Sequence, residues 1–210
     1  MTMHEKRDFD KEAAAWDANP GRVKLAHEVA DAIIGAIKLS RDMEALDFGC
    51  GTGLVTMKLQ PLVKTILGAD SSQGMLYVLQ KKAETQGVRN VRTQYVDFEK
   101  GGRVSGKFHL IVSSMTLHHV QDTAALFRQW KELLLPGGEV CFADLDAEDG
   151  SFHGDNTGVF HQGFDRNRLK TFLRQSGFTD MRDMTATTMI REVEGKGKIA
   201  FPVFLIRARG

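Results

Sequence analysis

The segment 45–54 combines an apolar run with closely spaced glycines in a way that suits ligand binding. It is typical of a strand, a tight turn containing Gly49, Cys50, Gly51 and Gly53, and then a helix. Glycine adopts positive φ and lets the backbone approach a ligand closely, and Gly53 would let the helix pack tightly on the strand. We therefore predict that this turn binds a ligand.

The glycine spacing does not match a dinucleotide-binding loop. Such a loop reads GxGxxG, whereas Leu54 occupies the sixth position here. Asp47 precedes the first glycine by two residues, where its carboxylate would repel a pyrophosphate and can receive a ligand ammonium through waters or backbone. An amino-acid moiety therefore fits this turn better, and a nicotinamide-dependent oxidoreductase is the weaker interpretation.

Two more acids end the next two predicted strands. Asp70 stands where doubly wound folds place a carboxylate on ribose hydroxyls, and Asp97, followed by Phe98, could accept from an exocyclic amine. The structural alternatives are a helix cap for Asp70 and a turn for Asp97. With Asp47, the three strand ends offer sites for an amino acid, a ribose and a base. That order is typical of a nucleoside joined to an amino acid.

Four of the seven histidines stand near the later strand ends. His118 and His119 follow the run 108–114, and histidine suits general-base chemistry near neutral pH. We predict that one of these two orients or deprotonates a reacting group. A helix-cap or loop hydrogen bond without chemistry is the alternative for each histidine.

The loop 147–164 is predicted to face the substrate, and its conformation does not follow from the sequence. We expect His153, His161 and Asp146 to line the substrate pocket, with Asp144 nearby at the end of the preceding strand. Zinc or iron on these histidines is an alternative, but we predict no metal site. The phenylalanines of the loop could be pocket walls or could tie it to the core; they are Phe152, Phe160 and Phe164.

These residues need a scaffold that brings strand ends together. Apolar runs alternate with helix-like segments, a rhythm that predicts a parallel sheet with helices on both faces and ligands at the carboxyl ends of the strands. The runs are 44–48, 65–70, 91–96, 108–114 and 138–145. Two strands near 178–187 and 199–207 should close the sheet.

Turn residues predict where several elements end. Pro136-Gly137-Gly138 should stop a helix before the fifth strand, and Asp165 and Gly177 should begin and end the last helix. The charged segment 191–198 is predicted to be a solvated hairpin turn and not a binding patch.

Composition limits the class of protein. The chain has 210 residues, 42% hydrophobic and 26% charged, which is typical of a globular protein, and we predict one domain over 1–210. The net charge of +1 lacks the basic excess of a nucleic-acid or anionic-membrane binder. The start of the chain is charged and no long apolar run follows, so we expect a cytoplasmic protein with two reduced cysteines.

Several motifs resemble those of one family, the class I S-adenosylmethionine-dependent methyltransferases. DFGCGTG (47–53) resembles its motif I, and LGADSSQGML (67–76) resembles its second-strand motif. FHLIVSSMTLHHVQD (108–122) and LLLPGGEVCFADL (133–145) resemble its fourth- and fifth-strand region. The likeness spans most of the chain and is to the small-molecule branch that includes the ubiquinone and menaquinone biosynthetic methyltransferases.

The resemblance implies a fold and a set of cofactor-binding residues. The fold would be a Rossmann-like α/β fold whose mostly parallel seven-stranded sheet has the order 3-2-1-4-5-7-6, with the seventh strand antiparallel. Asp70 would bind the ribose hydroxyls, Met75 one face of adenine, and Ser114 the methionine end. The residues implied to contact the cofactor are Asp47, Gly49, Cys50, Gly51, Gly53, Asp70, Ser71, Met75, Asp97, Phe98 and Ser114.

The first 22 residues resemble the amino-terminal lid of the family. Trp16 and Arg22 are candidates to cover the cofactor, although Trp16 could instead anchor the segment on the core. Residues 1–22 are therefore predicted to close over the bound cofactor.

The activity implied by the resemblance is methyl transfer from S-adenosylmethionine to a small-molecule acceptor, with O, N, C and S all open as the methylated atom. Such an in-line displacement depends mainly on positioning. A nucleic-acid methyltransferase is less expected, because SSMTLHH lacks the Asn-Pro-Pro-aromatic signature. The alternative is a regulatory or partner protein that binds S-adenosylmethionine without transferring the methyl group.

Overall fold

The strands form where apolar runs alternate with helices. The computed structural model describes residues 7–210, and all seven strands in that range belong to one sheet with the order β3-β2-β1-β4-β5-β7-β6. The parallel strands are β1 (Glu44–Phe48), β2 (Thr65–Asp70), β3 (Val91–Tyr95), β4 (Phe108–Ser114) and β5 (Leu134–Leu145). β6 (Thr179–Val193) and β7 (Gly197–Arg209) form a hairpin, and β7 runs antiparallel to β5. The predicted α/β fold and strand order are confirmed.

Two predicted boundaries were wrong. The structure assigns Pro136-Gly137-Gly138 to β5 and not to a break before it, with a register shift against β4 between Phe108 and Leu110. The turn between β6 and β7 is confined to 194–196, because backbone pairing continues through Val193 and Gly197. Charged side chains can belong to these strands because both faces of the hairpin tip are largely exposed, so the charges stay in contact with solvent.

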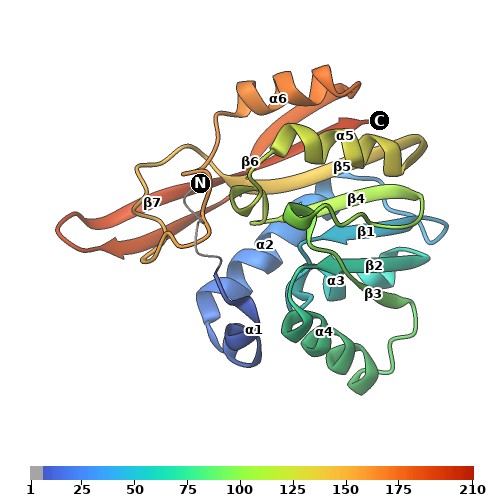
Figure 1. Cartoon of the computed structure of the whole chain (residues 1–210), viewed down its shortest axis with the longest axis horizontal. Coiled ribbons are helices and arrows are strands. Elements are labelled where there is room, and N and C mark those ends of the chain that lie inside the picture. The colour runs from blue at the N-terminus through green and yellow to red at the C-terminus, as the bar shows by residue number, and fades with distance from the viewer. Residues whose placement is uncertain (1–6) are drawn as a thin grey trace.

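Helices cover both faces of the sheet, as predicted, and Figure 1 shows the two layers. α2 (Pro20–Ala36), α3 (Leu54–Leu59) and α4 (Gln73–Thr85) lie on one face, and α5 (Thr123–Leu133) and α6 (Arg166–Gln175) on the other. Polar side chains accept from backbone N–H groups at four of the helix starts; they are Asn19, Ser72, Asp122 and Asp165. Gly177 follows α6 with φ of 86°, so the predicted limits of that helix are confirmed.

The remaining short helices connect these elements. They are α1 (Phe9–Glu12), η1 (Ala13–Ala18), η2 (Gln60–Leu62), η3 (Phe98–Lys100) and η4 (Leu117–His119). α1 and η1 pack against α4, which places the amino-terminal segment beside the carboxyl ends of the parallel strands. None of the helices within residues 7–210 is long and apolar enough to cross a membrane.

Alternating side chains of the central strands supply both cores. In β1, Leu46 packs into the core under α5 and α6, whereas Ala45 packs into the core under α2 and α3. In β4, Ile111 packs into the first of these cores and Leu110 into the second. Because successive side chains of a strand point to opposite faces, both faces of the central strands are buried. The carboxyl ends of these strands are therefore held in fixed positions.

The glycine turn after β1 is tied to β2 and packed against the loop after β4. The N–H groups of Gly49 and Cys50 donate to the carbonyl of Ala69 at 2.8 and 3.1 Å. Gly49 has φ of 72°, and a Cβ on it would lie 2.3 Å from Cγ2 of Thr116. Glycine is therefore required at this position by backbone conformation and by close packing together.

We expect Gly49→Ala to destabilise the fold by about 2 kcal/mol or more, because it adds a clash to an unfavourable φ. Gly101→Ala is the matched control, since Gly101 has φ of 78° and open space around its Cα. That control should lose only about 1 kcal/mol. Urea unfolding measures both, and equal losses in the two variants would contradict the role assigned to Thr116.

Candidate functional site

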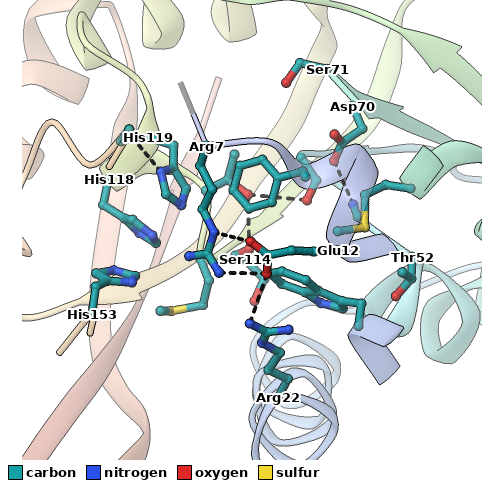
Figure 2. Close-up of a pocket in the computed structure, with 18 of the residues that line it drawn as sticks. Arg7, Glu12, Arg22, Thr52, Asp70, Ser71, Ser114, His118, His119 and His153 are labelled. Atoms are coloured by element: carbon teal, nitrogen blue, oxygen red, sulfur yellow. Dashed lines mark hydrogen bonds and ion pairs between the residues drawn. The ribbon is translucent and has the colours of Figure 1, made fainter. Parts of the chain in front are cut away.

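A cavity of about 1500 Å3 opens at the carboxyl ends of the parallel strands. Its walls come from four regions: the strand ends of β1, β2, β3 and β4, the segment 7–22, the loop 147–164, and the tip of β6. In the view of Figure 2, Asp70, Ser71 and Thr52 lie on one side and a group of histidines on the other. The cavity therefore has two chemically different ends.

The first end contains nearly all of the residues predicted to contact a cofactor. Those that line the cavity are Trp16, Asp47, Gly49, Cys50, Gly51, Asp70, Ser71, Met75, Asp97, Phe98 and Ser114. A Cβ added to Gly51 would meet no protein atom within 4 Å, so this backbone faces open space. Gly53 is not part of the lining, because its Cα faces Leu79, whose Cδ1 would lie 2.2 Å from an added Cβ. Gly53 thus lets α3 and α4 pack closely and does not face the cavity.

Asp70 joins the glycine turn to the start of α4. Its carboxylate accepts from the N–H of Gly51 at 2.8 Å and from the N–H of Ser72 at 2.9 Å. The N-cap of α4 is Ser72 and not Asp70, so the helix-cap alternative for Asp70 was wrong, and its carboxylate lines the cavity. Its position at the end of β2 puts it beside the turn that follows β1.

Asp47 is fully buried beneath the glycine turn. Burial raises the pKa of its carboxyl to about 7, although a hydrogen bond from the Thr56 hydroxyl at 2.6 Å opposes the shift and the charge of Asp70 adds to it. The group is therefore close to its protonation midpoint at neutral pH. A cation arriving nearby would favour its ionised form.

Charged and aromatic side chains of the amino-terminal segment cover the cavity. The guanidinium carbon of Arg22 lies 3.8 Å from the centroid of the Trp16 ring. Arg22 donates to Glu12 at 3.2 Å, and Arg7 donates to the same carboxylate through Nε and Nη2 at 2.6 and 2.8 Å. Trp16 and Arg22 thus line the cavity, and the lid stays a prediction; residues 1–6 of that segment are outside the described residues.

Two aspartates of the amino-terminal segment bind it to α4 and to the glycine turn. Asp10 accepts from the Ser72 hydroxyl at 2.6 Å and from the N–H of Gly74 at 2.7 Å. Asp17 accepts from the Thr52 hydroxyl at 2.6 Å and from Lys82 at 2.7 Å. The cover is therefore held by polar contacts at both of its ends.

His118 and Asp144 form a buried pair at the second end of the cavity. Nδ1 of His118 lies 2.7 Å from Oδ1 of Asp144, and the N–H groups of His118 and Leu145 also donate to that carboxylate. Burial opposes ionisation of Asp144, but the charge and hydrogen bonds of His118 outweigh it and lower the pKa of Asp144. Asp144 therefore holds Nδ1–H of His118 and leaves Nε2 as the nitrogen for a ligand.

Two more imidazoles adjoin His118. The ring centroid of His119 lies 4.2 Å away and that of His153 4.9 Å away. Burial, reinforced by the charge of His118, lowers the pKa of His119 to about 3 and that of His153 to about 4. Nδ1 of His119 lies 2.7 Å from the carbonyl of Gly158, while Nε2 of His153 is buried without a partner in the described part of the chain. Both rings are therefore neutral at physiological pH and offer lone pairs.

The structure does not bring His161 and Asp146 to the cavity. Nε2 of His161 lies 2.9 Å from the carbonyl of Val120, and Asp146 forms a two-point ion pair with Arg166 at 2.6 Å. Their predicted place in the pocket is corrected because the strand ends at Leu145 and Asp146 turns toward α6. Within residues 7–210, no three His, Cys, Asp or Glu side chains are arranged to hold a metal ion.

The three phenylalanines of the loop, left open by the sequence as pocket walls or core anchors, divide between the two. Phe152 and Phe160 line the cavity, but Phe164 packs against Phe204 in the core. Other lining residues were missed by the sequence analysis. Met115 follows β4 with φ of 54°, a conformation that its residue type does not signal. The tip of β6 lines the cavity over 189–192, so the prediction that 191–198 is only a solvated turn was wrong for its first two residues.

The comparisons with known proteins agree with this geometry. The family described as a methyltransferase domain matches residues 45–138. This segment of the chain is similar to a methyltransferase domain. Among curated proteins, an uncharacterized methyltransferase of Schizosaccharomyces pombe is 35% identical over 135 residues, which are 58% of this chain and 48% of that protein. A ubiquinone biosynthesis O-methyltransferase of Acinetobacter baumannii is 24% identical over 164 residues, covering 72% of this chain and 66% of that protein.

Solved structures share the fold of this protein. YcgJ from Bacillus subtilis matches with a TM-score of 0.74 and 16% identity, covering 87% of this chain and 98% of that one. Phosphoethanolamine N-methyltransferase 2 of Haemonchus contortus, solved with S-adenosyl-L-methionine, has a TM-score of 0.70 and 13% identity, covering 97% and 60%. The fold that the resemblance implies is confirmed, and these curated relatives carry methyltransferase names. The chain spans about half the length of the yeast relative and about two thirds of the Acinetobacter one.

The buried histidines predict that stability falls with acidity. The pKa of His119 is about 3 in the folded protein and 6.5 unperturbed, so below pH 6.5 the unfolded chain binds the extra proton. His119 should therefore lower the free energy of unfolding by about 1.4 kcal/mol for each pH unit between pH 6.5 and about 3, and should have no such effect above pH 6.5. Asp47 acts oppositely between pH 3.8 and 7, since its raised pKa favours the folded state at lower pH.

The contribution of His119 to the pH dependence of stability is the difference between the wild type and a variant without this histidine. Urea unfolding of the wild type and His119→Gln, at pH 7 and pH 5, should show a smaller acid loss in the variant. Asp47 contributes equally to both proteins and cancels. Parallel pH dependences in the two proteins would contradict a neutral, buried His119.

Proposed function

We propose that this protein transfers a methyl group from S-adenosylmethionine to a proton-bearing heteroatom of a small-molecule acceptor, producing S-adenosylhomocysteine. The observation that carries the proposal is the single cavity shared by the glycine turn with Asp70 and by the His118–Asp144 pair. One end suits the cofactor of the family, and the other suits removal of a proton. The activity of the whole protein rests on this geometry and on the methyltransferase domain match.

The first end of the cavity fits S-adenosylmethionine. Asp47, whose pKa of about 7 makes it responsive to a cation, would bind the methionine ammonium, and the open backbone at Gly51 would lie against the ligand. Asp70 would bind the ribose hydroxyls, while Met75, Asp97 and Phe98 would surround the adenine, as the family resemblance implies. Trp16 would cover this end from the amino-terminal segment.

The chain's own contribution to the chemistry is positioning and proton removal. When bound, S-adenosylmethionine supplies the methyl group as its S–CH3 bond breaks and sulfur keeps the electron pair. His118 takes the proton of the acceptor at Nε2 while the acceptor's electron pair forms the new bond to carbon. Asp144 stabilises the imidazolium that results, because its carboxylate already accepts Nδ1–H at 2.7 Å.

The histidine wall favours an acceptor that carries a hydrogen-bond donor. Nδ1 of both His118 and His119 is engaged with an acceptor, so Nε2 is the nitrogen that each ring leaves for a ligand, and on the neutral ring of His119 it is a lone pair. A hydroxyl, amine or thiol satisfies such lone pairs, whereas a carbon nucleophile does not. We therefore favour O-, N- or S-methylation. A cytoplasmic location and the absence of a nucleic-acid partner stay predictions from the sequence.

The first experiment is calorimetric titration with S-adenosylhomocysteine, with NAD as the control ligand, followed by an acceptor screen that measures S-adenosylhomocysteine formation. We expect micromolar binding of the first ligand, no binding of NAD, and turnover with a hydroxyl-, amine- or thiol-bearing acceptor. Tight binding without turnover on any acceptor would instead indicate a regulatory protein. Absence of S-adenosylhomocysteine binding by the folded protein would contradict the cofactor assignment.

His118→Gln should lower kcat by about 100-fold or more and leave the affinity for S-adenosylhomocysteine unchanged, because it removes the proton acceptor alone. His161→Gln is the matched control, since that ring lies outside the cavity, and it should keep wild-type turnover. Steady-state kinetics with the best acceptor of the screen measures both. Equal kcat in the two variants would remove His118 as the base.

Cofactor binding should release a proton from Asp47 at pH values below its pKa of about 7. The ligand ammonium favours the carboxylate, so affinity should rise by up to about tenfold per pH unit below pH 7 and level off above it. Titrations of S-adenosylhomocysteine at pH 6 in buffers of different ionisation enthalpy measure the released proton. Asp47→Asn should abolish this release, and a variant that released the same number of protons would contradict the assignment.

A further inference from the structure

Arg191 differs from the other arginines that line the cavity. Arg7 and Arg22 both donate to the carboxylate of Glu12, so that acid balances part of their charge. Arg191, near the tip of β6, donates through Nη1 to the backbone carbonyl of Phe152. No carboxylate in residues 7–210 forms an ion pair with Arg191. Its remaining N–H donors are therefore available to a ligand.

The position of this guanidinium is held by the loop that it contacts. Its central carbon lies 4.8 Å from the centroid of the Phe152 ring, while one nitrogen is occupied by the carbonyl of the same residue. Stacking and the hydrogen bond together restrict the side chain even though Arg191 is exposed to solvent. A restricted guanidinium loses less conformational entropy when it binds an anion.

A continuous wall of rings connects Arg191 to the proposed base. The ring of Phe152 lies 4.8 Å from that of His153, which lies 4.9 Å from that of His118. On the other side, His119 lies 5.2 Å from Phe9, whose ring is 5.3 Å from the guanidinium of Arg7. Flat side chains along the whole wall suit a planar acceptor that lies against them.

Charge along this wall is concentrated at its ends. The pKa values of His119 and His153, about 3 and 4, keep these rings neutral, so they supply no positive charge. The acids that also line this part of the cavity are Asp155 and Glu192. Asp155 accepts from the N–H and hydroxyl of Thr157, and neither acid forms an ion pair with Arg191 in the described chain. Among the lysines and arginines that line the cavity within residues 7–210, Arg191 is thus the one without an ion pair.

We propose that Arg191 binds the carboxylate or phosphate group of a planar acceptor whose hydroxyl lies at His118. The guanidinium presents parallel N–H donors that match the paired oxygens of such a group. The acceptor class is therefore an aromatic hydroxy acid or its phosphate counterpart. This inference rests on the proposed function, because it assigns the acceptor end of the same cavity.

The test uses the protein saturated with S-adenosylhomocysteine and three probes that differ in one group. They are 4-hydroxybenzoate, 4-hydroxyphenylphosphonate and 4-hydroxybenzamide. We expect at least one of the two anions to bind about tenfold or more tightly than the amide, the range of a charge-assisted hydrogen bond. Whether the carboxylate or the phosphonate binds more tightly distinguishes the two kinds of acceptor.

Variants of Arg191 test whether the preference for the anionic probes depends on this residue. Arg191→Gln should abolish the anion preference, and Arg191→Lys should keep only part of it, because lysine keeps the charge without the paired donors. Arg182→Gln is the matched control, since Arg182 is an exposed arginine of the same strand outside the cavity lining. All variants should bind S-adenosylhomocysteine as the wild type does, which shows that they are folded.

Three results would overturn the proposal: the amide binding as tightly as both anions, Arg191→Gln keeping the anion preference, or none of the probes binding. Failure of the proposed function gives a different result. In that case S-adenosylhomocysteine does not bind, or anions bind through Arg191 while no acceptor is ever methylated.

Discussion

Parallel pairing of β1 with β2 and with β4 is the constraint on which the rest of the site depends. The pairs Phe48–Ala69 and Asp47–Val112 align the strand ends, so the turns that follow three separate strands meet at one edge. The Ala69 carbonyl then fixes the glycine turn, and the Asp70 carboxylate fixes it again from the next residue. A shift of one residue in either pairing would turn the side chains of the shifted strand to the opposite face of the sheet and misalign the turns that follow.

Two fully buried carboxyls in this site show that burial alone does not decide ionisation. Asp47 has the Thr56 hydroxyl as its hydrogen-bonding partner and lies near the charge of Asp70, and its pKa is raised to about 7. Asp144 accepts from the His118 ring and from two backbone N–H groups, and its pKa is lowered. The difference suits the roles proposed for them, in which Asp47 responds to an arriving ammonium and Asp144 stays an anion beside a base.

The cavity is completed by segments far apart in the chain. The amino-terminal segment covers it through Asp10 and Asp17, which bind α4 and the glycine turn, while the tip of the β6–β7 hairpin approaches from the opposite end of the sequence. Both are exposed to solvent and held by polar contacts and not by deep burial. The central sheet can therefore position the chemistry while these outer segments shape the space for the acceptor.

The sequence by itself determined the sheet order through its resemblance to a family, the helix limits through Asp165 and Gly177, and the cofactor end through the glycine turn. The helix limits and the glycine turn depend on local chemistry, since turns and caps are set by residues close together in the chain. Only the tertiary structure decided which histidines meet. His118, His119 and His153 share one wall, whereas His161 and Asp146 bond elsewhere. It also decided the partner of His118 and the place of Arg191, because these contacts join residues from different elements whose distance no local pattern specifies.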